Sequence, residues 1–169
     1  MEDRIQISIL PGTEADASLI AALHFAVAER LTREYGRGHW SSSPTDRAVL
    51  RGIRSSRVLV ACNGVSVVGT LRLATKKPWA IDPSYFTRVE RPLYLHDLAV
   101  DPGMQRQGIG RQLLTAAAAA GKAWPADAIR LDAYDAAAGA GPFYTRNGFR
   151  KVGSVTYRGT PLVYFELLL

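Results

Sequence analysis

One short stretch of the chain has the composition of an anion-binding loop. Val100–Leu114, with the sequence VDPGMQRQGIGRQLL, places Gly108 and Gly110 directly before an apolar helical pattern. The first backbone N–H groups of a helix have no intrahelical acceptor, and together with the helix dipole they bind anions. The two glycines remove side chains that would keep a diphosphate from these amides, and Arg106 and Arg111 add positive charge. The stretch predicts a phosphate-binding loop between a strand and a helix.

Two common phosphate-binding motifs do not match this loop. A P-loop ends in Gly-Lys-Ser or Gly-Lys-Thr, and the loop has neither ending. A dinucleotide-binding turn has the spacing Gly-x-Gly-x-x-Gly at the start of a βαβ unit. Here Leu113 stands where the third glycine would be, and the loop follows several predicted strands. The phosphate ligand therefore belongs to a third class.

Hydrophobic periodicity places the loop in a mixed α/β chain. Alternating patterns predict strands at residues 6–10, 93–100, 128–134 and 160–169, two more within 57–75, and a further one within 150–159. The pair Asn63-Gly64 predicts a tight hairpin between the two strands of 57–75. Helical spacing predicts helices from Thr13 onward and at 44–56, 111–124 and 141–149, with Pro44 in the first turn of the second helix. The order of these elements indicates the mixed α/β class.

Length and composition narrow the class further. A chain of 169 residues is long enough for one core and short for two independent domains. It contains no run of about 18 apolar residues, and its N-terminal stretch lacks the pattern of a secretory signal. Its single cysteine, Cys62, excludes a disulfide framework and a Cys-rich zinc site. We expect one soluble, cytoplasmic domain over residues 1–169, with no metal and no membrane contact.

The positive charge of the chain suits a phosphate-bearing ligand. The formal net charge is +6, which would favour either a polyanion or a phosphate compound. Nucleic-acid binders usually gather Lys and Arg on one face, whereas the arginines here are scattered along the sequence. We therefore expect no nucleic-acid partner.

Two segments resemble the signatures of a known enzyme family. LAVDPGMQRQGIGRQLL resembles the acetyl-CoA motif of the GNAT family of N-acetyltransferases, with Gln105, Gly108 and Gly110 at the motif positions. FYTRNGFRKVG resembles the second signature of that family, an aromatic-Tyr pair on a short helix followed by Gly-Phe. The order of predicted elements is similar to that family over nearly the whole chain.

The resemblance implies a fold and a coenzyme site. The fold is α/β, with a mixed, mostly antiparallel central sheet flanked by helices and a V-shaped cleft between strand 93–100 and the following parallel strand 128–134. The pantetheine arm of acetyl-CoA would lie in this cleft and pair with the backbone of Leu98, Ala99 and Val100. The loop residues implied to bind the coenzyme are Gln105, Arg106, Gln107, Gly108, Ile109, Gly110 and Arg111.

Acyl transfer to an amine needs a base, because an alkylamine is almost wholly protonated at neutral pH. His96 is the best candidate, since an ordinary histidine pKa of about 6.5 lets it accept a proton. In a regular strand Tyr94, His96 and Leu98 share one face, and Asp97 lies on the other unless a bulge intervenes. In the family the base stands at positions that correspond here to Tyr94 or His96. We expect His96 to be the base; Asp97 is the second candidate, or it orients the imidazole or pairs with an arginine. The alternative for His96 is an interior histidine hydrogen-bonded to a neighbour.

Tyr144 is the candidate acid. A phenol with a pKa of about 10 stays protonated at neutral pH and can donate to a thiolate leaving group. In the family the tyrosine of the second signature plays this part and contacts the coenzyme. Alternatively, Tyr144 packs the short helix onto the sheet, as we expect for Phe143. The family often has an asparagine where this chain has Ala137, so a coenzyme contact there must come from backbone or from Asp135.

The acceptor is not specified by any motif. In the family it enters beside segments that correspond here to Glu34–Pro44 and Lys77–Glu90. Asp82 or Glu34 would attract a cationic amine. The residues expected to contact the acceptor are Trp40, Trp79, Tyr85, Phe86, Tyr94 and His96. The alternative is that the aromatic residues cover the core beneath long loops.

These observations lead to one expected function and one alternative. The expected function is an acetyl-CoA-dependent N-acetyltransferase that passes the acetyl group directly to a primary amine of a small molecule or peptide in a ternary complex. Covalent transfer through Cys62 is disfavoured because no base adjoins it in sequence. The alternative is a non-catalytic acyl-CoA-binding regulatory module. The apolar C-terminal segment, VYFELLL, leaves a homodimer open.

Overall fold

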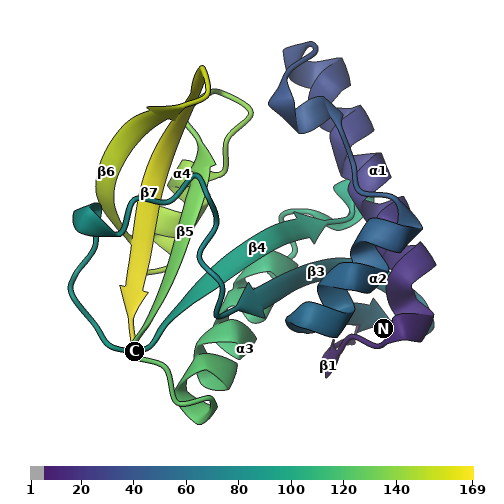
Figure 1. Cartoon of the computed structure of the whole chain (residues 1–169). Coiled ribbons are helices and arrows are strands. Elements are labelled where there is room, and N and C mark those ends of the chain that lie inside the picture. Colours follow the sequence, from purple (N-terminus) through teal and green to yellow (C-terminus); the bar gives the residue numbers. More distant parts are fainter. Residues whose placement is uncertain (1–5) are drawn as a thin grey trace. The chain divides into compact units, whose positions relative to one another are not determined.

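The computed structural model describes residues 6–169, and its elements follow the predicted order (Figure 1). The first half contains β1 (Ile7–Pro11), α1 (Ala17–Tyr35), α2 (Asp46–Ser55), β2 (Arg57–Asn63), β3 (Ser66–Ala74) and β4 (Pro92–Val100). The second half contains α3 (Ile109–Ala123), β5 (Ala128–Tyr134), α4 (Gly141–Arg146), β6 (Arg150–Tyr157) and β7 (Thr160–Leu168). Four single turns of 3₁₀ helix complete the elements: η1 (Glu14–Asp16), η2 (His39–Ser41), η3 (Pro83–Tyr85) and η4 (Pro102–Met104).

The strands form a mixed sheet in the order β1-β2-β3-β4-β5-β7-β6. β1 with β2, β5 with β7, and β6 with β7 are antiparallel, whereas β4 and β5 are parallel and opposite each other at Pro92–Tyr94 and Ala128–Arg130. A parallel pair needs a crossover, and α3 supplies it between β4 and β5. The predicted fold class, a mostly antiparallel sheet flanked by helices, is confirmed.

The chain divides into two compact units, and β3, β4 and α3 each contribute to both. The first unit comprises the chain up to Arg72 together with Asp97–Ala116, and the second comprises Leu73–His96 and Ala117–Leu169. That residues 1–169 act as a single domain stays a prediction.

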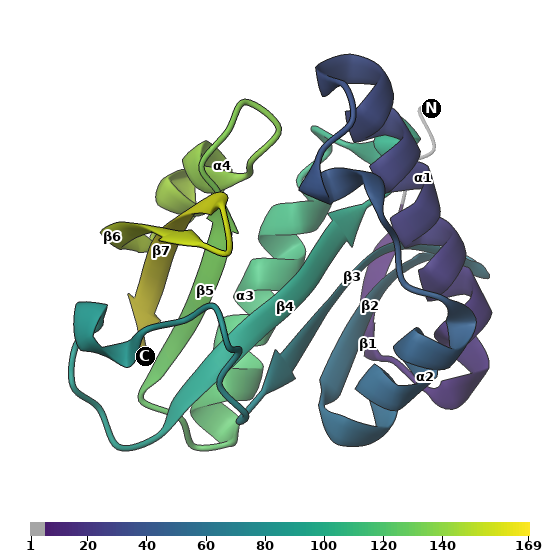
Figure 2. The same ribbon diagram turned by 45° about the horizontal axis from the view of Figure 1, so that its top comes forward.

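In the first unit, α1 and α2 lie on one face of the sheet (Figure 2), and the start of α3 packs on the other face, at Gly69 of β3. Ile20 of α1 packs on Val58 and Val60 of β2, together with apolar side chains of α2. Successive side chains of a strand point to opposite faces, so Ala61 lies on the other side, near Ile109 and Leu113 of α3. The alternation of β2 thus places α1 and α2 on one face and the start of α3 on the other.

The second helix begins two residues later than the sequence predicts. The N-cap of α2 is Thr45, whose side-chain oxygen accepts a hydrogen bond of 3.2 Å from the Ala48 N–H. Asp46 occupies the first turn, where its charge complements the helix dipole. Pro44 therefore lies before the cap and not in the first turn, because the threonine side chain is the better cap.

In the second unit, the segment between β3 and β4 is held on the β5–β7–β6 strands by a buried cluster. Ile81, Phe86, Tyr94 and Tyr164 are all buried and pack together. The hydroxyl of Tyr164 donates to the Ala80 carbonyl and accepts a hydrogen bond of 3.1 Å from the Asp82 N–H. These contacts anchor the segment on the strands although it contains only one turn of helix.

A buried carboxylate, that of Glu166, anchors the segment between β3 and β4 at Thr87. Glu166 has a side chain that is 1% exposed and accepts hydrogen bonds from the Thr87 N–H (3.1 Å), the Thr87 hydroxyl (2.5 Å) and the Arg150 guanidinium (2.7 Å). Burial alone would raise the pKa of this carboxyl, but the bonds from Thr87 and Arg150 outweigh it and lower the pKa. Arg130, also buried, donates to the Thr87 carbonyl at 2.7 Å.

We expect Glu166→Ala to destabilise the protein by about 2–4 kcal/mol, because it leaves the partly buried Thr87 N–H without an acceptor and removes the partner of Arg150. Urea unfolding at neutral pH measures this loss. The matched control is Glu29→Ala, an exposed helical glutamate, for which we expect a change within about 0.5 kcal/mol. Equal stabilities of the two variants would show that the Glu166 network does not stabilise the fold.

Candidate active site

The predicted phosphate-binding loop lies in the first unit, between β4 and α3. Arg106 and Gly108 adopt left-handed conformations, with φ of 62° and 80°. A Cβ built on Gly108 meets no atom within 4 Å, so the space in front of the loop is open. Gln105 donates from its side-chain amide to the Val100 carbonyl at 3.2 Å, which ties the start of the loop to the end of β4.

The start of α3 presents its first amides at this loop. The earliest helical hydrogen bond runs from the Gln112 N–H to the Gly108 carbonyl, at 3.0 Å. The amides of Ile109, Gly110 and Arg111 precede that bond, so they have no acceptor within the helix. The side chains of Arg106 and Arg111 are exposed. This end of α3 therefore has the donors and the charge that a diphosphate requires.

Close packing on β3 fixes the position of those amides. Ile109 and Leu113 are buried against Gly69, where a Cβ would lie 3.0 Å from Leu113 Cδ1 and 3.1 Å from Ile109 Cγ2. Gly69 therefore lets the first turn of α3 approach the sheet closely. Because the Ile109 side chain is buried there, only its backbone can contact a ligand.

The strand that precedes the loop is irregular at Asp97. Its φ is +56°, a left-handed conformation that is uncommon outside glycine and that is tolerated best by Asn and Asp. Leu93, Tyr94 and Leu95 are buried in succession, so both faces of β4 are covered there. The positive φ at Asp97 is the kind of irregularity that the alternation argument excepted, so the predicted role of His96 rests on its chemistry and its place on β4.

Asp97 pairs with an arginine, as one of the predicted alternatives had it. Its Oδ2 lies 2.5 Å from Nε of Arg72 on β3. The following residues, Leu98 and Val100, are half-buried, and Ala99 is buried. His96 is half-buried and belongs to the second unit.

Tyr144 lies in an aromatic cluster of the second unit. It is 6% exposed, and its ring centroid lies 5.4 Å from that of Phe143, 5.6 Å from Phe149 and 5.8 Å from Phe165. The cluster holds α4 on the sheet, so Tyr144 has the packing role that we considered as an alternative. Its role as the acid stays a prediction. Asp135 is exposed in the segment before α4.

Of the residues expected at the acceptor, Trp79 and Tyr85 line a cavity of about 450 Å³ in the second unit. Trp79 is 84% exposed, and the Tyr85 ring packs edge-on against Tyr164 at 5.4 Å. Asp82 lines the same cavity; its bond from Ser84 lowers the pKa of its carboxyl, which is therefore charged at neutral pH. This cavity combines aromatic surface with one anion, which suits a cation.

Two of the expected acceptor contacts belong to the core instead. Phe86 and Tyr94 are 7% and 4% exposed, and Phe86 stacks at 5.2 Å on Tyr164. Their side chains fill the core beneath the β3–β4 segment, which favours the alternative considered for these aromatic residues. Trp40, in the first unit, is half-buried and donates from Nε1 to the Gly36 carbonyl at 2.9 Å.

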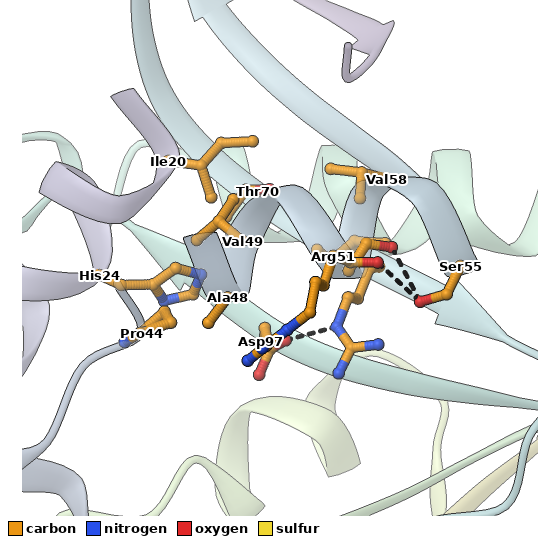
Figure 3. A pocket seen from close by; sticks show the side chains of 13 residues that line it. Ile20, His24, Pro44, Ala48, Val49, Arg51, Ser55, Val58, Thr70 and Asp97 are labelled. Carbon is orange, nitrogen blue, oxygen red and sulfur yellow. Dashed lines mark hydrogen bonds and ion pairs between the residues drawn. The ribbon is translucent and has the colours of Figure 1, made fainter. Parts of the chain in front are cut away.

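A second polar cavity was not predicted. In the first unit, a cavity of about 300 Å³ lies among α1, α2, β2, β3 and the end of β4 that begins at Asp97. Its polar lining includes His24, Arg51, Arg72 and Asp97 (Figure 3). Burial lowers the pKa of His24; Asp97 opposes this effect and Arg72 adds to it. No local pattern relates these four residues, because they come from separate elements.

Comparison with known proteins identifies the family. Residues 54–151, more than half of the chain, match the family model for the acetyltransferase (GNAT) domain. The chain belongs to the GNAT acetyltransferase family. The matched region includes the predicted coenzyme loop, β4 and Tyr144, so the resemblance noted in the sequence is confirmed.

Curated relatives share a shorter stretch of this GNAT protein. Two alpha-tubulin N-acetyltransferases of Trypanosoma cruzi, numbered 1 and 2, are each 40% identical to it over 73 residues. The match covers 43% of this chain but only 22% of the length of those relatives.

Solved structures match the fold over nearly the whole GNAT chain. An N-acetyltransferase of Staphylococcus aureus Mu50 is 18% identical with a TM-score of 0.73, covering 96% of this chain and 98% of its own. The ribosomal-protein-alanine N-acetyltransferase of Brucella melitensis is 17% identical with a TM-score of 0.73, covering 96% and 99%. The Salmonella typhimurium protein yncA, solved with its cofactor acetyl-CoA, is 17% identical with a TM-score of 0.69, covering 96% and 94%. At these identities the likeness shows the fold.

The family match shows an acetyltransferase domain in this chain. Two further observations concern residues 6–169 alone. No helix among them is both long and apolar enough to cross a membrane. No three His, Cys, Asp or Glu side chains among them are grouped so as to hold a metal ion.

Proposed function

We propose that this GNAT protein transfers the acetyl group of acetyl-CoA to a primary amine by direct transfer in a ternary complex. The observation that supports the proposal most is the start of α3, where the amides of Ile109, Gly110 and Arg111 lie behind an open glycine loop. Few other ligands need a row of free amides flanked by two exposed arginines as a pyrophosphate does.

The residues present fit the coenzyme. The amides at the start of α3 and the Arg106 and Arg111 side chains would hold the pyrophosphate, and the backbone of Leu98–Val100 would pair with the pantetheine arm. Gln105 would act indirectly, because its side chain already fixes the loop to Val100. When bound, acetyl-CoA supplies a thioester as acetyl donor. Asp135, exposed before α4, is the proposed contact from that segment.

His96 and Tyr144 would move the protons of the reaction. The amine must lose a proton before it attacks, and His96 would accept that proton directly or through water. A thiolate leaves, and the Tyr144 hydroxyl would protonate it, since a phenol keeps its proton at neutral pH. Asp97 is engaged with Arg72, so we assign it a place beside the acceptor rather than the role of base.

Direct transfer is favoured over an acyl-enzyme on Cys62. Burial raises the pKa of the Cys62 thiol, and a nearby aspartate, Asp16, raises it further. Little of the nucleophilic thiolate therefore exists at neutral pH. An acyl-enzyme would require a depressed thiol pKa, which is the opposite of what this environment produces.

The proposal is tested by calorimetry with acetyl-CoA, followed by free-thiol release with a panel of amines. Heat of coenzyme binding together with thiol release that depends on an amine would support it. Binding of acetyl-CoA with no thiol release for any amine would favour the non-catalytic module. An absence of binding at millimolar acetyl-CoA would contradict the proposal altogether.

We expect Tyr144→Phe to lower kcat by about 10–100-fold while leaving acetyl-CoA affinity nearly unchanged, because general acid catalysis contributes roughly 10²–10⁴-fold and water can replace part of it. The phenylalanine keeps the ring contacts with Phe143, Phe149 and Phe165, so the fold is preserved. Single-turnover thiol release measures the effect. The control is Phe143→Leu, which perturbs the same cluster without removing a hydroxyl; an equal loss of kcat in both variants would assign Tyr144 to packing alone.

A further inference from the structure

The cavity of the first unit has a polar end and an apolar end. In Figure 3 the side chains of His24, Arg51 and Asp97 gather at one end, and those of Ile20 and Val58 lie toward the other. Its volume of about 300 Å³ is at the lower limit of cavities that bind small molecules. Such a cavity suits a small ligand with a charged head and a short aliphatic body.

The polar end has charged groups whose binding capacity is not used up. Arg72 donates to Asp97 through Nε alone, at 2.5 Å, so its two terminal nitrogens have no partner among the described residues. Among residues 6–169, no group accepts a hydrogen bond from the Arg51 guanidinium either. Two guanidinium groups face one carboxylate, which leaves a net positive charge for a ligand anion. A planar guanidinium binds a carboxylate best, often through two parallel hydrogen bonds.

The same end also has groups that accept hydrogen bonds from an ammonium. Asp97 uses Oδ2 for Arg72, which leaves Oδ1 for a ligand. The pKa of His24 is lowered, first by burial, so its imidazole is neutral at neutral pH and keeps one nitrogen as an acceptor. A ligand with both a carboxylate and an ammonium would therefore satisfy every charged group of the cavity.

The position of Asp97 connects this cavity with the proposed reaction. Asp97 directly precedes Leu98–Val100, the backbone proposed to pair with pantetheine, and both belong to the first unit with the phosphate-binding loop. An ammonium bound at Asp97 would therefore lie next to the backbone that is proposed to pair with pantetheine. The aromatic cavity around Asp82 has one anion and no cation among its lining residues, so it has no group that would select a carboxylate.

We infer that the cavity between α1, α2 and β3 binds the acceptor, and that this acceptor is a small aliphatic α-amino acid or a close analogue, with its carboxylate on Arg51 and Arg72 and its ammonium on Asp97 and His24. The inference rests on the proposed function. The apolar end, with Ile20, Val49, Val58 and Leu71, takes the aliphatic side chain.

Gly52 lies beside the Arg72 side chain. Glycine in the middle of a helix costs about 1 kcal/mol relative to alanine, and α2 has one at the point where the Arg72 side chain passes. A Cβ on Gly52 would lie 3.5 Å from Arg72 Cδ, so alanine fits there in ordinary contact but a larger side chain would displace the arginine.

The test uses three probes that differ in one charged group each: L-leucine, L-leucinamide, which lacks the carboxylate, and 4-methylpentanoate, which lacks the ammonium. Ligand-observed NMR on the full chain without coenzyme measures binding, and thiol release with acetyl-CoA measures turnover of the two amines. We expect L-leucine to bind at least about 10-fold more tightly than either analogue, since each lost charge-assisted hydrogen bond costs about that factor. We also expect a lower KM for L-leucine than for L-leucinamide. Equal binding of all three probes would overturn the inference.

Variants on one helix separate this cavity from the rest of the protein. Arg51→Met keeps the length of the side chain and is expected to weaken L-leucine binding at least about 10-fold while leaving L-leucinamide unchanged. Arg47→Met is the matched control, because Arg47 is exposed one turn earlier on α2 and does not line the cavity.

Ala48→Leu fills the cavity without a charge change and is expected to abolish binding of L-leucine. Trp79→Ala, in the second unit, should leave L-leucine binding unchanged; a larger effect from Trp79→Ala than from Arg51→Met would place the acceptor in the aromatic cavity instead.

Failure of this inference is distinct from failure of the proposed function. If acetyl-CoA binds and thiol is released with other amines but L-leucine neither binds nor turns over, only the acceptor class is wrong. If acetyl-CoA itself does not bind, the proposed function fails, whereas NMR binding of L-leucine would still establish the cavity as a zwitterion site.

Discussion

Gly110→Glu is expected to abolish coenzyme binding while the protein stays folded. Gly110 provides one of the amides that precede the first helical hydrogen bond of α3, and a carboxylate there would lie where a pyrophosphate must bind. We expect the Kd for acetyl-CoA to rise at least about 100-fold, the equivalent of two lost charge-assisted hydrogen bonds. Calorimetric titration of acetyl-CoA into the variant measures this change.

The same substitution should not weaken the fold, which makes the result easy to interpret. Glutamate has a higher helix propensity than glycine by about 0.5–1 kcal/mol, and a negative charge in the first turn of α3 interacts favourably with the helix dipole. We therefore expect the free energy of unfolding to stay the same or to rise. This opposite response of stability and binding is typical of a position where glycine is needed for ligand binding and not for folding.

Ala119→Glu is the matched control for Gly110→Glu. It adds the same side chain to an exposed position of the same helix, more than two turns from the loop. We expect acetyl-CoA affinity within about 2-fold of wild type, because surface charges at this distance are largely screened. If the affinity of Gly110→Glu were also unchanged, the assignment of the loop to the coenzyme would be wrong.

The order of elements was predictable because local patterns determine it. The prediction for β5 matches Ala128–Tyr134, and the hairpin at Asn63-Gly64 is present, with φ of 58° at Gly64. In both cases the signal lies within a few residues: a short apolar run in one case and a residue that tolerates positive φ in the other. The proposed coenzyme loop could be recognised for the same reason, since its glycines and arginines lie within six residues of one another.

Features that depend on long-range contacts were not predictable in the same way. Asp97 adopts φ of +56° in the middle of a strand and pairs with Arg72, twenty-five residues away, and neither fact has a local signal. Phe86 looks like other aromatic loop residues in the sequence, but it packs on Tyr164 of β7 and is buried. Only the path of the β3–β4 segment over the second unit distinguishes it from the exposed Trp79.

The two candidate acceptor cavities illustrate the same limit. The aromatic cavity was partly anticipated, because Trp79, Asp82 and Tyr85 are close in sequence and rich in binding chemistry. The cavity around His24 and Arg72 was not, because its residues come from α1, α2, β3 and β4 and each has an ordinary place in its own element. The cavity formed by distant residues has charges of both signs. If it binds the acceptor as we infer, it would distinguish a zwitterion from a simple amine.

His96→Ala is the second substitution for which we expect a large effect. If His96 accepts the amine proton, its loss should lower kcat by about 10²–10⁴-fold, the usual contribution of a general base. Acetyl-CoA affinity should change by less than about 3-fold, since none of the proposed pyrophosphate contacts involves His96 and water can fill the space of the imidazole. The reason for the split between kcat and affinity is that the base acts on the acceptor and not on the coenzyme.

A pH profile separates the base role of His96 from a packing role. For the wild type, kcat/KM should fall as the pH decreases through the pKa of the base, and this acidic limb should disappear in His96→Ala if His96 is that base. His39→Ala, an exposed histidine of η2, is the control and should keep both the rate and the acidic limb. If His96→Ala lost turnover but kept the acidic limb of wild type, another group such as His24 would be the base. His96 would then have only a structural role in β4. Turnover of His96→Ala at the wild-type rate with a true acceptor would remove His96 from the mechanism.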